Sequence, residues 1–447
     1  MTVVLLSTYD LGRPPFGLAS PAAWLRRSGL KVVTGDLSRD PLDDAAVAAA
    51  RLIAVYLPMH TATRLAIPVF DRVRTLNPHA TLVAYGLYAP LSEELLRAHG
   101  VCEVLGPESE AELVALASAL ARSPDHQITR SPDPELARPL PKLTFIRPDR
   151  SSLPPLSRYA SVQMPDGTRR IAGATDATRG CKHRCRHCPI VPIYDGQFRV
   201  VPLDVVLADI EQQVAAGAEH ITFGDPDFFN GPTHSRRLVE SLHLRHPDVT
   251  YDVTIKIEHL LKHRALLPIL AATGCLFITS AVESVDDEVL AKLEKGHTRA
   301  DFAEAARLCR QAGVRMAPTF VAFTPWTSLE GFADLLDTVA ALDLVEQVAP
   351  VQWGLRLLVT KGSRLLELDD IRQRIQDFDP VTLTYPWRHD DPRVDTLQTN
   401  IMRAVGVKLT QSRRELFDIV RGLTGLGAAP AAPARATIPY LNEPWYC

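Results

Sequence analysis

The sequence carries almost no net charge, because 49 lysines and arginines are balanced by 52 aspartates and glutamates, which leaves −3 over 447 residues. This balance gives the chain as a whole no electrostatic attraction to nucleic acid or to an anionic membrane. A long apolar run is also absent, since the longest, residues 265–282, is broken at Thr273 and Gly274 and predicts a helix end followed by a buried strand. We therefore expect a small-molecule substrate, no nucleic acid and no membrane partner.

The first residues lack a basic region ahead of an apolar core, so no signal peptide is expected. The seven cysteines are an odd number with three clustered, which suits cofactor ligation better than a disulfide framework. Together these features predict a cytoplasmic, reducing location. The hydrophobic fraction of 46% is ample for a packed core, and the length is typical of about three domains.

Residues 1–122 alternate short apolar runs with amphipathic segments, which predicts a doubly wound, Rossmann-like α/β domain. Ligands of such sheets bind beyond the carboxyl ends of the strands, here marked by Asp10, Gly12, His60 and Gly86. No G-x-G-x-x-G is present, so a dinucleotide is not indicated. The expected strands are residues 3–6, 31–33, 52–57 and 82–85.

Residues 123–157 contain eight prolines, a density that blocks helices and central strands and predicts a linker. From residue 158 to 361 the pattern repeats strand then helix, which predicts an open, partial parallel (β/α)6 barrel. Residues 362–426 are expected to form a helical extension with one helix at 396–424, and residues 427–447 a flexible tail that ends in Cys447. The expected barrel strands are residues 175–179, 221–224, 251–257, 276–282, 316–323 and 351–359.

The strongest functional signal is the run of Cys181, Cys185 and Cys188, with the spacing C-x3-C-x2-C after the first expected barrel strand. Three thiolates can hold a four-iron cluster whose fourth iron, without a protein ligand, is able to chelate a small molecule. A zinc site completed by His183 or His187 is an alternative, although closed zinc sites usually use two separated ligand pairs. An iron-sulfur electron carrier is another, but a carrier would normally fill all four cluster positions.

This motif in this position resembles the radical S-adenosylmethionine (SAM) superfamily, whose three cysteines bind a [4Fe-4S] cluster that chelates the methionine end of SAM. The residue before the last cysteine is usually aromatic in that superfamily and is His187 here. The resemblance implies an enzyme that reductively cleaves a carbon-sulfur bond of SAM. It also implies an external one-electron reductant of the flavodoxin or ferredoxin type.

The same resemblance implies which strand ends contact SAM. The second strand of many members is followed by Gly-Gly-Glu, which meets the methionine amine, and the third, fourth and sixth strands supply contacts to the carboxylate, ribose and adenine. For the aspartates, a helix cap or turn is the alternative. Lys256 and Glu258 alternate with apolar residues, so both are expected on one face of a strand, directed into the barrel, with a solvated alternating strand as the alternative. An inward arginine at the sixth strand would need a carboxylate partner or an anionic substrate. The implied contacts are Gly224, Asp225, Asp227, Lys256, Glu258, Ser280, Glu283 and Arg356.

A doubly wound domain ahead of such a barrel resembles the cobalamin-binding radical SAM enzymes. Their D-x-H-x-x-G motif supplies a histidine to cobalt, but the corresponding loop, residues 10–17, has no histidine, so cobalt ligation by that route is not expected. Two alternatives stay open, namely cobalamin bound without a protein ligand below it and a retained domain that binds no cobalamin. We expect His60 to be an ordinary loop residue.

Residues 10–20, 223–232 and 442–447 resemble a narrower radical SAM group whose tail reads Cys-Cys-Ala-Glu-Pro or Cys-selenocysteine-Ala-Glu-Pro. The resemblance implies that Cys447 is the first member of a vicinal pair, with the chain stopping where a selenocysteine codon was read as a stop. Thiol and selenol ligands suit a soft element such as trivalent arsenic.

Similar enzymes include the radical SAM enzyme of arsinothricin biosynthesis, which moves the 3-amino-3-carboxypropyl group of SAM onto arsenite. This resemblance predicts arsenite as the substrate and Cys447 as its thiol ligand, with a frayed terminus as the alternative. Other possible activities are methyl transfer, favoured if the N-terminal domain holds cobalamin, and 5′-deoxyadenosyl radical chemistry on another small substrate. Cys102, Cys275 and Cys309 are expected to be core residues.

Overall fold

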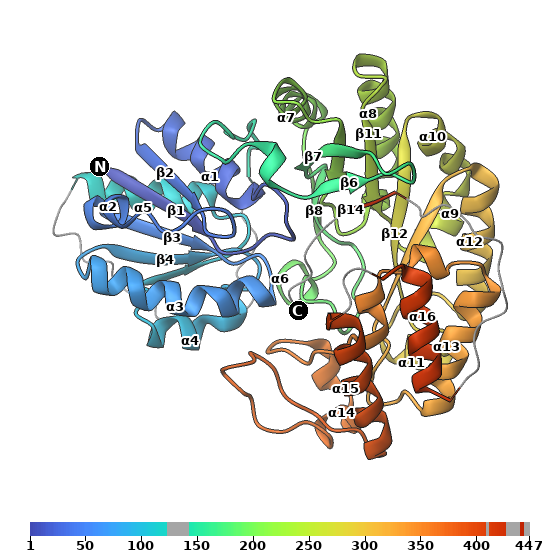
Figure 1. The fold of residues 1–447 in the computed structure, drawn as a ribbon. Coiled ribbons are helices and arrows are strands. Elements are labelled where there is room, and N and C mark those ends of the chain that lie inside the picture. Colours follow the sequence, from blue (N-terminus) through green and yellow to red (C-terminus); the bar gives the residue numbers. More distant parts are fainter. Residues whose placement is uncertain (123–142, 408–410, 426–438, 442–447) are drawn as a thin grey trace.

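The computed structural model describes residues 1–122, 143–407, 411–425 and 439–441. An N-terminal α/β domain and a larger α/β barrel lie side by side, with the last helices packed against the barrel (Figure 1). The doubly wound domain and the partial barrel predicted from the sequence are both confirmed. No helix among the described residues is long and apolar enough to cross a membrane.

The N-terminal sheet is parallel with the order β2-β1-β3-β4-β5. Its strands are short and apolar on both faces: Val3 and Leu5 pack towards α1 and α5, while Val4 and Leu6 pack towards α2, α3 and α4. Only β5 was not predicted, because its three residues give too short a pattern. The strands are β1 (Thr2–Ser7), β2 (Lys31–Asp36), β3 (Leu52–Tyr56), β4 (Thr81–Tyr85) and β5 (Glu103–Leu105), and the helices are α1 (Phe16–Arg27), α2 (Asp44–Ala49), α3 (His60–Leu76), α4 (Glu93–Ala98) and α5 (Glu110–Arg122).

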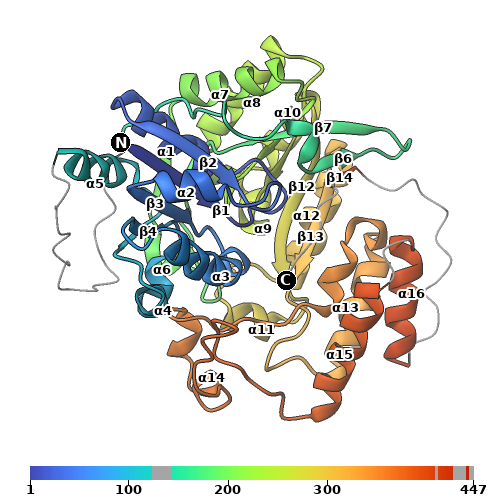
Figure 2. The same ribbon diagram turned by 60° about the vertical axis from the view of Figure 1, so that its left-hand side comes forward.

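The barrel sheet has the order β13-β12-β11-β10-β7-β6-β14, in which the first five strands are parallel and β6 and β14 are antiparallel additions at one edge. Helices cover its outer side (Figures 1 and 2). The strands are β6 (Ser161–Gln163), β7 (Arg169–Thr175), β10 (His220–Phe223), β11 (Thr250–Thr254), β12 (Cys275–Glu283), β13 (Arg315–Phe320) and β14 (Tyr440–Leu441), and the helices are α7 (Leu203–Ala215), α8 (Pro232–Arg245), α9 (Ile257–Lys262), α10 (Leu267–Ala272), α11 (Asp287–Lys292), α12 (Arg299–Ala312), α13 (Leu329–Ala341) and α14 (Asp369–Arg372).

The first and sixth barrel strands differ from the prediction. The first is β7, and the segment expected there instead forms β8 (Thr178–Gly180), which pairs antiparallel with β9 (Phe198–Val200). The sixth is reduced to a single parallel bridge between Phe323 and Arg356. Its first half is a 3₁₀ helix, Pro350–Gly354, since Pro350 favours a helical first turn.

Among the described residues of the C-terminal extension, α14 is followed by two longer helices, so the prediction of one helix at 396–424 was wrong. They are α15 (Pro392–Val407) and α16 (Arg413–Leu423), and a capping box between Ser412 and Glu415 begins the second. Both pack over the barrel core, where the Trp353 and Phe417 ring centroids are 5.3 Å apart. This packing occupies the place where a regular sixth strand would continue the sheet.

The second half of the predicted linker is fixed against both domains. Asp149 accepts a hydrogen bond from Arg26 at 2.7 Å, and Arg150 pairs with the buried Asp209 of α7 at 2.7 Å. The tail is also anchored at one point, because Tyr440–Leu441 pairs with β6. Residues 427–436 and Cys447 lie outside the described residues.

The three cysteines expected in the core behave differently from one another. Cys275 and Cys309 are buried as predicted, whereas Cys102 is exposed beside β5, so its placement in the core was wrong. The short edge strand leaves this side chain without a covering helix.

Candidate active site

The cysteine run forms the loop between β8 and α6 (Val191–Tyr194). Cys185 is buried, and Cys181 and Cys188 are partly buried. Burial raises the pKa of the Cys181 thiol to about 11 and that of the Cys188 thiol to about 12. Thiols with such pKa values become thiolates only when a bound cation compensates the charge, so this donor set fits a metal centre.

The loop begins at a glycine that no other residue can replace without strain. Gly180 has φ 76°, and a Cβ atom there would lie 2.3 Å from the Tyr194 ring. Asn230 holds the same turn, because its Nδ2 donates to the Gly180 carbonyl at 3.2 Å and its Oδ1 accepts from the Lys182 backbone at 3.3 Å. Asn230 was not predicted as a site residue, although it lies in the segment that carries the expected Gly-Asp motif.

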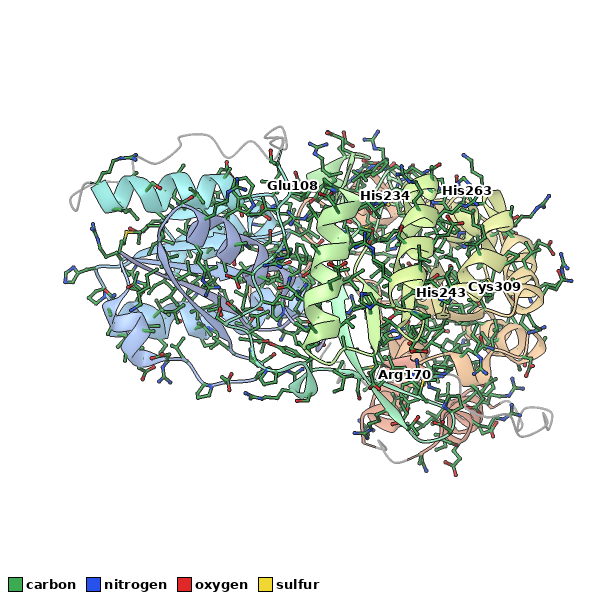
Figure 3. The ribbon with its side chains drawn as sticks, turned by 90° about the horizontal axis from the view of Figure 1, so that it is seen from above. Glu108, Arg170, His234, His243, His263 and Cys309 are labelled. Carbon is green, nitrogen blue, oxygen red and sulfur yellow. The ribbon has the colours of Figure 1, made fainter. Side chains whose placement is uncertain are left out.

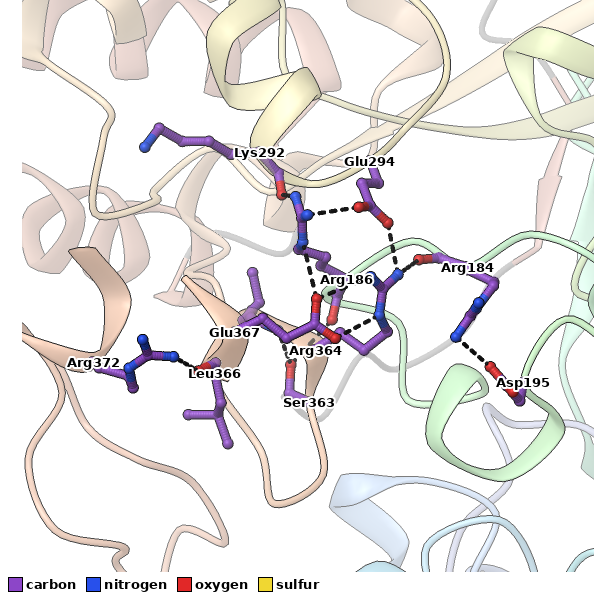
Figure 4. A network of polar contacts seen from close by, with 11 residues as sticks. Arg184, Arg186, Asp195, Lys292, Glu294, Ser363, Arg364, Leu366, Glu367 and Arg372 are labelled. Carbon is purple, nitrogen blue, oxygen red and sulfur yellow. Dashed lines mark hydrogen bonds and ion pairs between the residues drawn. The ribbon is translucent and has the colours of Figure 1, made fainter. Parts of the chain in front are cut away.

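Basic residues between the cysteines fix the loop to the rest of the barrel (Figure 4). Arg186 pairs with Glu294 at 2.6 Å, and Arg364 bridges the same carboxylate at 2.6 Å and the Arg184 carbonyl at 2.6 Å. Ser363 donates to the Arg186 carbonyl at 3.1 Å. These contacts stabilise the shape of the loop without using a cysteine, and the sequence gives no local signal for them because the partners come from distant segments.

Glu283, at the end of β12, lies beneath the last cysteines. Its Oε1 is 3.1 Å from His187 Nε2 and accepts a hydrogen bond from Lys295 at 3.3 Å. Burial alone would raise the pKa of Glu283, but the ammonium of Lys295 and the imidazole of His187 lower it to about 2. Its backbone is left-handed, with φ 69°, where the pairing of β12 with β13 shifts register. The predicted SAM contact is therefore a charged carboxylate that also positions His187.

The segment after β10 supports the base of the cysteine loop. Asp225 is buried and accepts hydrogen bonds from the Ala177 backbone at 2.9 Å and the Thr178 hydroxyl at 2.5 Å, and burial raises its pKa to about 7. A Cβ atom on Gly224 would lie 2.4 Å from an Asp176 oxygen. Asp227 caps the following 3₁₀ helix (Phe228–Asn230) with one oxygen, as the cap alternative anticipated.

Lys256 and Glu258 come together, but not by the alternation of a strand as predicted. The strand β11 ends at Thr254, and Lys256 is the N-cap residue of α9. Its Nζ donates to Glu258 at 3.3 Å and lies 3.2 Å from His183 Nδ1. Ser280 is buried in β12 and donates to the Ile255 carbonyl at 2.7 Å. The two charged groups converge beside the cysteine loop because a helix turn brings them together.

Arg356 has the carboxylate partner that an inward arginine requires. It donates to Asp395 of α15 at 2.6 Å, and its guanidinium lies 3.4 Å from the centroid of the Trp387 ring. The assignment of Arg356 to a regular sixth strand was wrong, since it forms only the bridge with Phe323. Its charge is compensated within the C-terminal extension.

The N-terminal domain contacts the barrel at the cysteine loop. Tyr88 and Leu91 follow β4. Burial, and to a lesser extent the nearby Cys188 thiolate, raise the pKa of the Tyr88 phenol above its usual range. Ile193 of α6 packs into the same apolar cluster as Leu91. Glu108 lies at this junction (Figure 3), 3.6 Å from Arg199 of β9. The carboxyl end of the N-terminal sheet is therefore adjacent to the loop that carries the three cysteines.

Residues 176–338 match the model of the radical SAM superfamily. This match covers the cysteine loop and the strand ends around it, and the domain before it has the fold of a cobalamin-binding domain. The match identifies a radical SAM domain in the barrel, and such a domain behind one with a cobalamin-binding-like fold indicates an enzyme.

One curated relative is similar to part of the chain. The bacteriochlorophyllide d C-8(2)-methyltransferase of Chlorobaculum tepidum is 26% identical over 268 residues, which are 58% of this chain and 56% of that protein. The chain thus spans about half the length of this curated relative.

Two solved structures share the fold. The cobalamin-dependent SAM radical enzyme OxsB, with aqua-cobalamin bound, superposes with a TM-score of 0.69 at 14% identity, over 95% of this chain and 71% of that chain. The radical SAM methyltransferase TsrM from Kitasatospora setae, with tryptophan and a SAM analogue bound, gives 0.60 at 18% identity, over 76% and 71% of the two chains. At these identities the likeness concerns the fold alone.

Proposed function

We propose that the protein is a radical SAM methyltransferase that acts on a small molecule and uses cobalamin as its methyl carrier. The observation that carries this proposal is the packing of Ile193, in the helix directly after the cysteine loop, against the apolar cluster that contains Leu91 at the carboxyl end of the N-terminal sheet. Ligands of doubly wound domains bind at that end of the sheet. A cofactor held there would lie next to the site of SAM cleavage.

The three cysteines would hold the cluster, whose open iron and bound SAM together supply one-electron cleavage of a carbon-sulfur bond. Lys256 and Glu258 present opposite charges 3.3 Å apart beside this loop and would orient the amine and carboxylate of the methionine end. Glu283 would keep the last cysteine in place through His187. The assignment of these roles rests on the motif and on the convergence of the side chains.

The N-terminal edge fits cobalamin held without a protein ligand to cobalt. Gly86 has φ 115° directly after β4, and a Cβ atom there would lie 2.7 Å from the Leu57 carbonyl oxygen, so only glycine fits this turn at the carboxyl edge of the sheet. The loop that would normally supply a histidine supplies none, and the Tyr56 ring instead covers Gly17, where a Cβ atom would lie 2.3 Å from the ring. Bound there, cobalamin would supply a carrier for the methyl group.

The test reconstitutes the full chain anaerobically with iron and sulfide and adds hydroxocobalamin. We expect cobalamin to remain bound through gel filtration at close to one equivalent. Turnover with reductant should release S-adenosylhomocysteine, from the SAM that gives its methyl group to cobalamin, and 5′-deoxyadenosine, from a second SAM cleaved at the cluster. Failure to retain cobalamin, with methylthioadenosine as the nucleoside product, would contradict the proposal. Release of 5′-deoxyadenosine alone would assign adenosyl radical chemistry to the same site.

A second candidate is transfer of the 3-amino-3-carboxypropyl group of SAM to trivalent arsenic. The resemblance of the tail around Cys447 to thiol and selenol tails favours it, because such ligands suit a soft element. The expected signature is arsenite-dependent methylthioadenosine, lowered at least tenfold by Cys447→Ser but not by Cys102→Ser. Full activity of the Cys447→Ser variant would exclude Cys447 as the ligand of arsenic in this reaction.

A further inference from the structure

Three ligand-type side chains meet beside the cysteine loop. They are His183 from the loop itself, Asp227 from the segment after β10, and His259 from α9. The Asp227 Oδ2 atom lies 3.3 Å from His183 Nε2 and 2.6 Å from His259 Nδ1. Asp227 and His259 are each 1% exposed, so the group is almost fully removed from water.

None of these three atoms has a hydrogen-bond partner with acceptable geometry. They contact one another as ion pairs when the rings are protonated, and a cation between them would replace those protons. The second carboxylate oxygen, by contrast, accepts a normal bond from the Phe229 backbone at 3.1 Å. The unpaired atoms are therefore the ones directed at a common point.

Glu258 is placed to support such a centre from outside. A metal bound at Nε2 of His183 leaves the ring proton on Nδ1, which lies 3.6 Å from Glu258 Oε2 and 3.2 Å from Lys256 Nζ, so that proton would be donated to Glu258 only once the Lys256 ammonium turns away from the nitrogen. Metal-bound histidines usually donate their other ring N–H to a carboxylate or carbonyl group. Lys256 then pairs with Glu258 at 3.3 Å and holds this carboxylate in position.

We propose that His183, Asp227 and His259 bind a divalent transition-metal ion, zinc or ferrous iron, at a site separate from the cysteines. Two imidazoles and one carboxylate are a donor set that both ions accept. Three protein ligands leave at least one coordination position for water or an oxygen of a substrate. In this proposal His183 binds the ion together with Asp227 and His259. His183 is then not the fourth ligand of a zinc knuckle formed with the cysteines.

The test measures metal in the cluster-loaded full chain. Protein reconstituted anaerobically is treated with a chelator, equilibrated with zinc and passed through gel filtration, and iron and zinc are then counted by mass spectrometry. We expect one zinc per chain in addition to the cluster iron. Zinc K-edge X-ray absorption is expected to show only nitrogen and oxygen ligands at about 2.0–2.2 Å, without sulfur at about 2.3 Å.

Variants locate the ion within the molecule. Asp227→Asn and His259→Asn are expected to weaken zinc binding at least tenfold while the cluster iron is retained. His234→Asn and His243→Asn, on α8 (Figure 3) and outside the three-residue group, are the matched controls and should bind zinc like the parent. Circular dichroism checks that each variant is folded. If a variant does not fold, the zinc K-edge spectrum of the parent protein tests the ligand set instead. A sulfur shell, no bound zinc, or unchanged binding in folded Asp227 and His259 variants would overturn the proposal.

Discussion

The Nζ atom of Lys295 lies 3.3 Å from Oε1 of Glu283, at the end of β12, and both side chains are buried beneath the cysteine loop. The same carboxylate oxygen is 3.1 Å from His187, which precedes Cys188. The charge of one glutamate thus connects the barrel sheet to the loop. Removing that charge leaves a buried ammonium without compensation.

We predict that Glu283→Gln lowers the free energy of unfolding by about 3–5 kcal/mol, because breaking a buried ion pair leaves Lys295 unpaired. Urea denaturation of the cluster-free protein under anaerobic conditions measures this change. Glu288→Gln, at an exposed position of α11, is the control and should alter stability by less than about 0.5 kcal/mol. Equal stability of the two variants would show that the pair contributes little.

Each of the single variants Cys181→Ala, Cys185→Ala and Cys188→Ala is expected to lose the cluster. Two thiolates cannot replace the three that hold the cluster, so iron and acid-labile sulfide should fall to less than a tenth of the parent values after reconstitution. Cys102→Ser, which changes an exposed cysteine, should keep the parent content. A cysteine variant that keeps its iron would exclude that residue as a ligand.

The Arg364 bridge should affect how long the cluster is retained rather than whether it forms. Arg364→Ala removes contacts to Glu294 and to the Arg184 carbonyl but no thiol, so we expect normal iron content at first and several-fold faster loss to a chelator. Absorbance near the visible cluster band follows this loss with time. Arg307→Ala, which removes an exposed pair with Glu304, is expected to behave like the parent.

Regular features of the sequence predicted the fold well. The runs around Val3, Leu52 and Leu82 are apolar on both faces, so their strands are recognisable without tertiary information. The spacing of the cysteines is equally local. In contrast, the sixth strand depended on whether Trp353 paired with the sheet or lay beneath α15 and α16, and only tertiary packing decides this.

The rest of the site could not be predicted because it is formed by distant segments. Glu294 and Arg364 reach the cysteine loop from two separate loops, and neither lies in a motif. His183, Asp227 and His259 are far apart in the sequence and share no motif, so only the structure shows that their ligand atoms lie close together. Lys256 and Glu258 were predicted to converge for the wrong reason, since a helix start replaces the expected strand.

A pH dependence is expected from Asp10, after β1. Burial raises its pKa from 3.8 to about 7, although Arg13 opposes the shift. The folded state therefore holds the proton more tightly than the unfolded state, so the contribution of Asp10 to stability is present below pH 3.8 and is lost as pH rises to about 7. The slope is at most about 1.4 kcal/mol per pH unit.

Asp10→Asn removes this titration, so its stability relative to the parent should increase between pH 5 and pH 7. Urea denaturation at half-unit pH intervals measures the difference between the two curves. Asp248→Asn, at an exposed position before β11, should follow the parent curve at every pH. Parallel stability curves for Asp10→Asn and the parent would mean that folding does not raise the pKa of Asp10.

Variants of Arg356 distinguish a structural role of this residue from a role in SAM binding. Its guanidinium is held by Asp395 and Trp387, so we expect Arg356→Gln to lower the melting temperature while the dissociation constant for SAM changes less than twofold. Isothermal titration of the cluster-loaded protein with SAM gives that constant, and calorimetry gives the melting temperature. Asp395→Asn, which removes the partner carboxylate, should produce the same pattern. If Arg356→Gln instead weakened SAM binding tenfold at an unchanged melting temperature, the arginine would border the adenine as the sequence resemblance implied, and its ion pair with Asp395 would have to open when SAM binds.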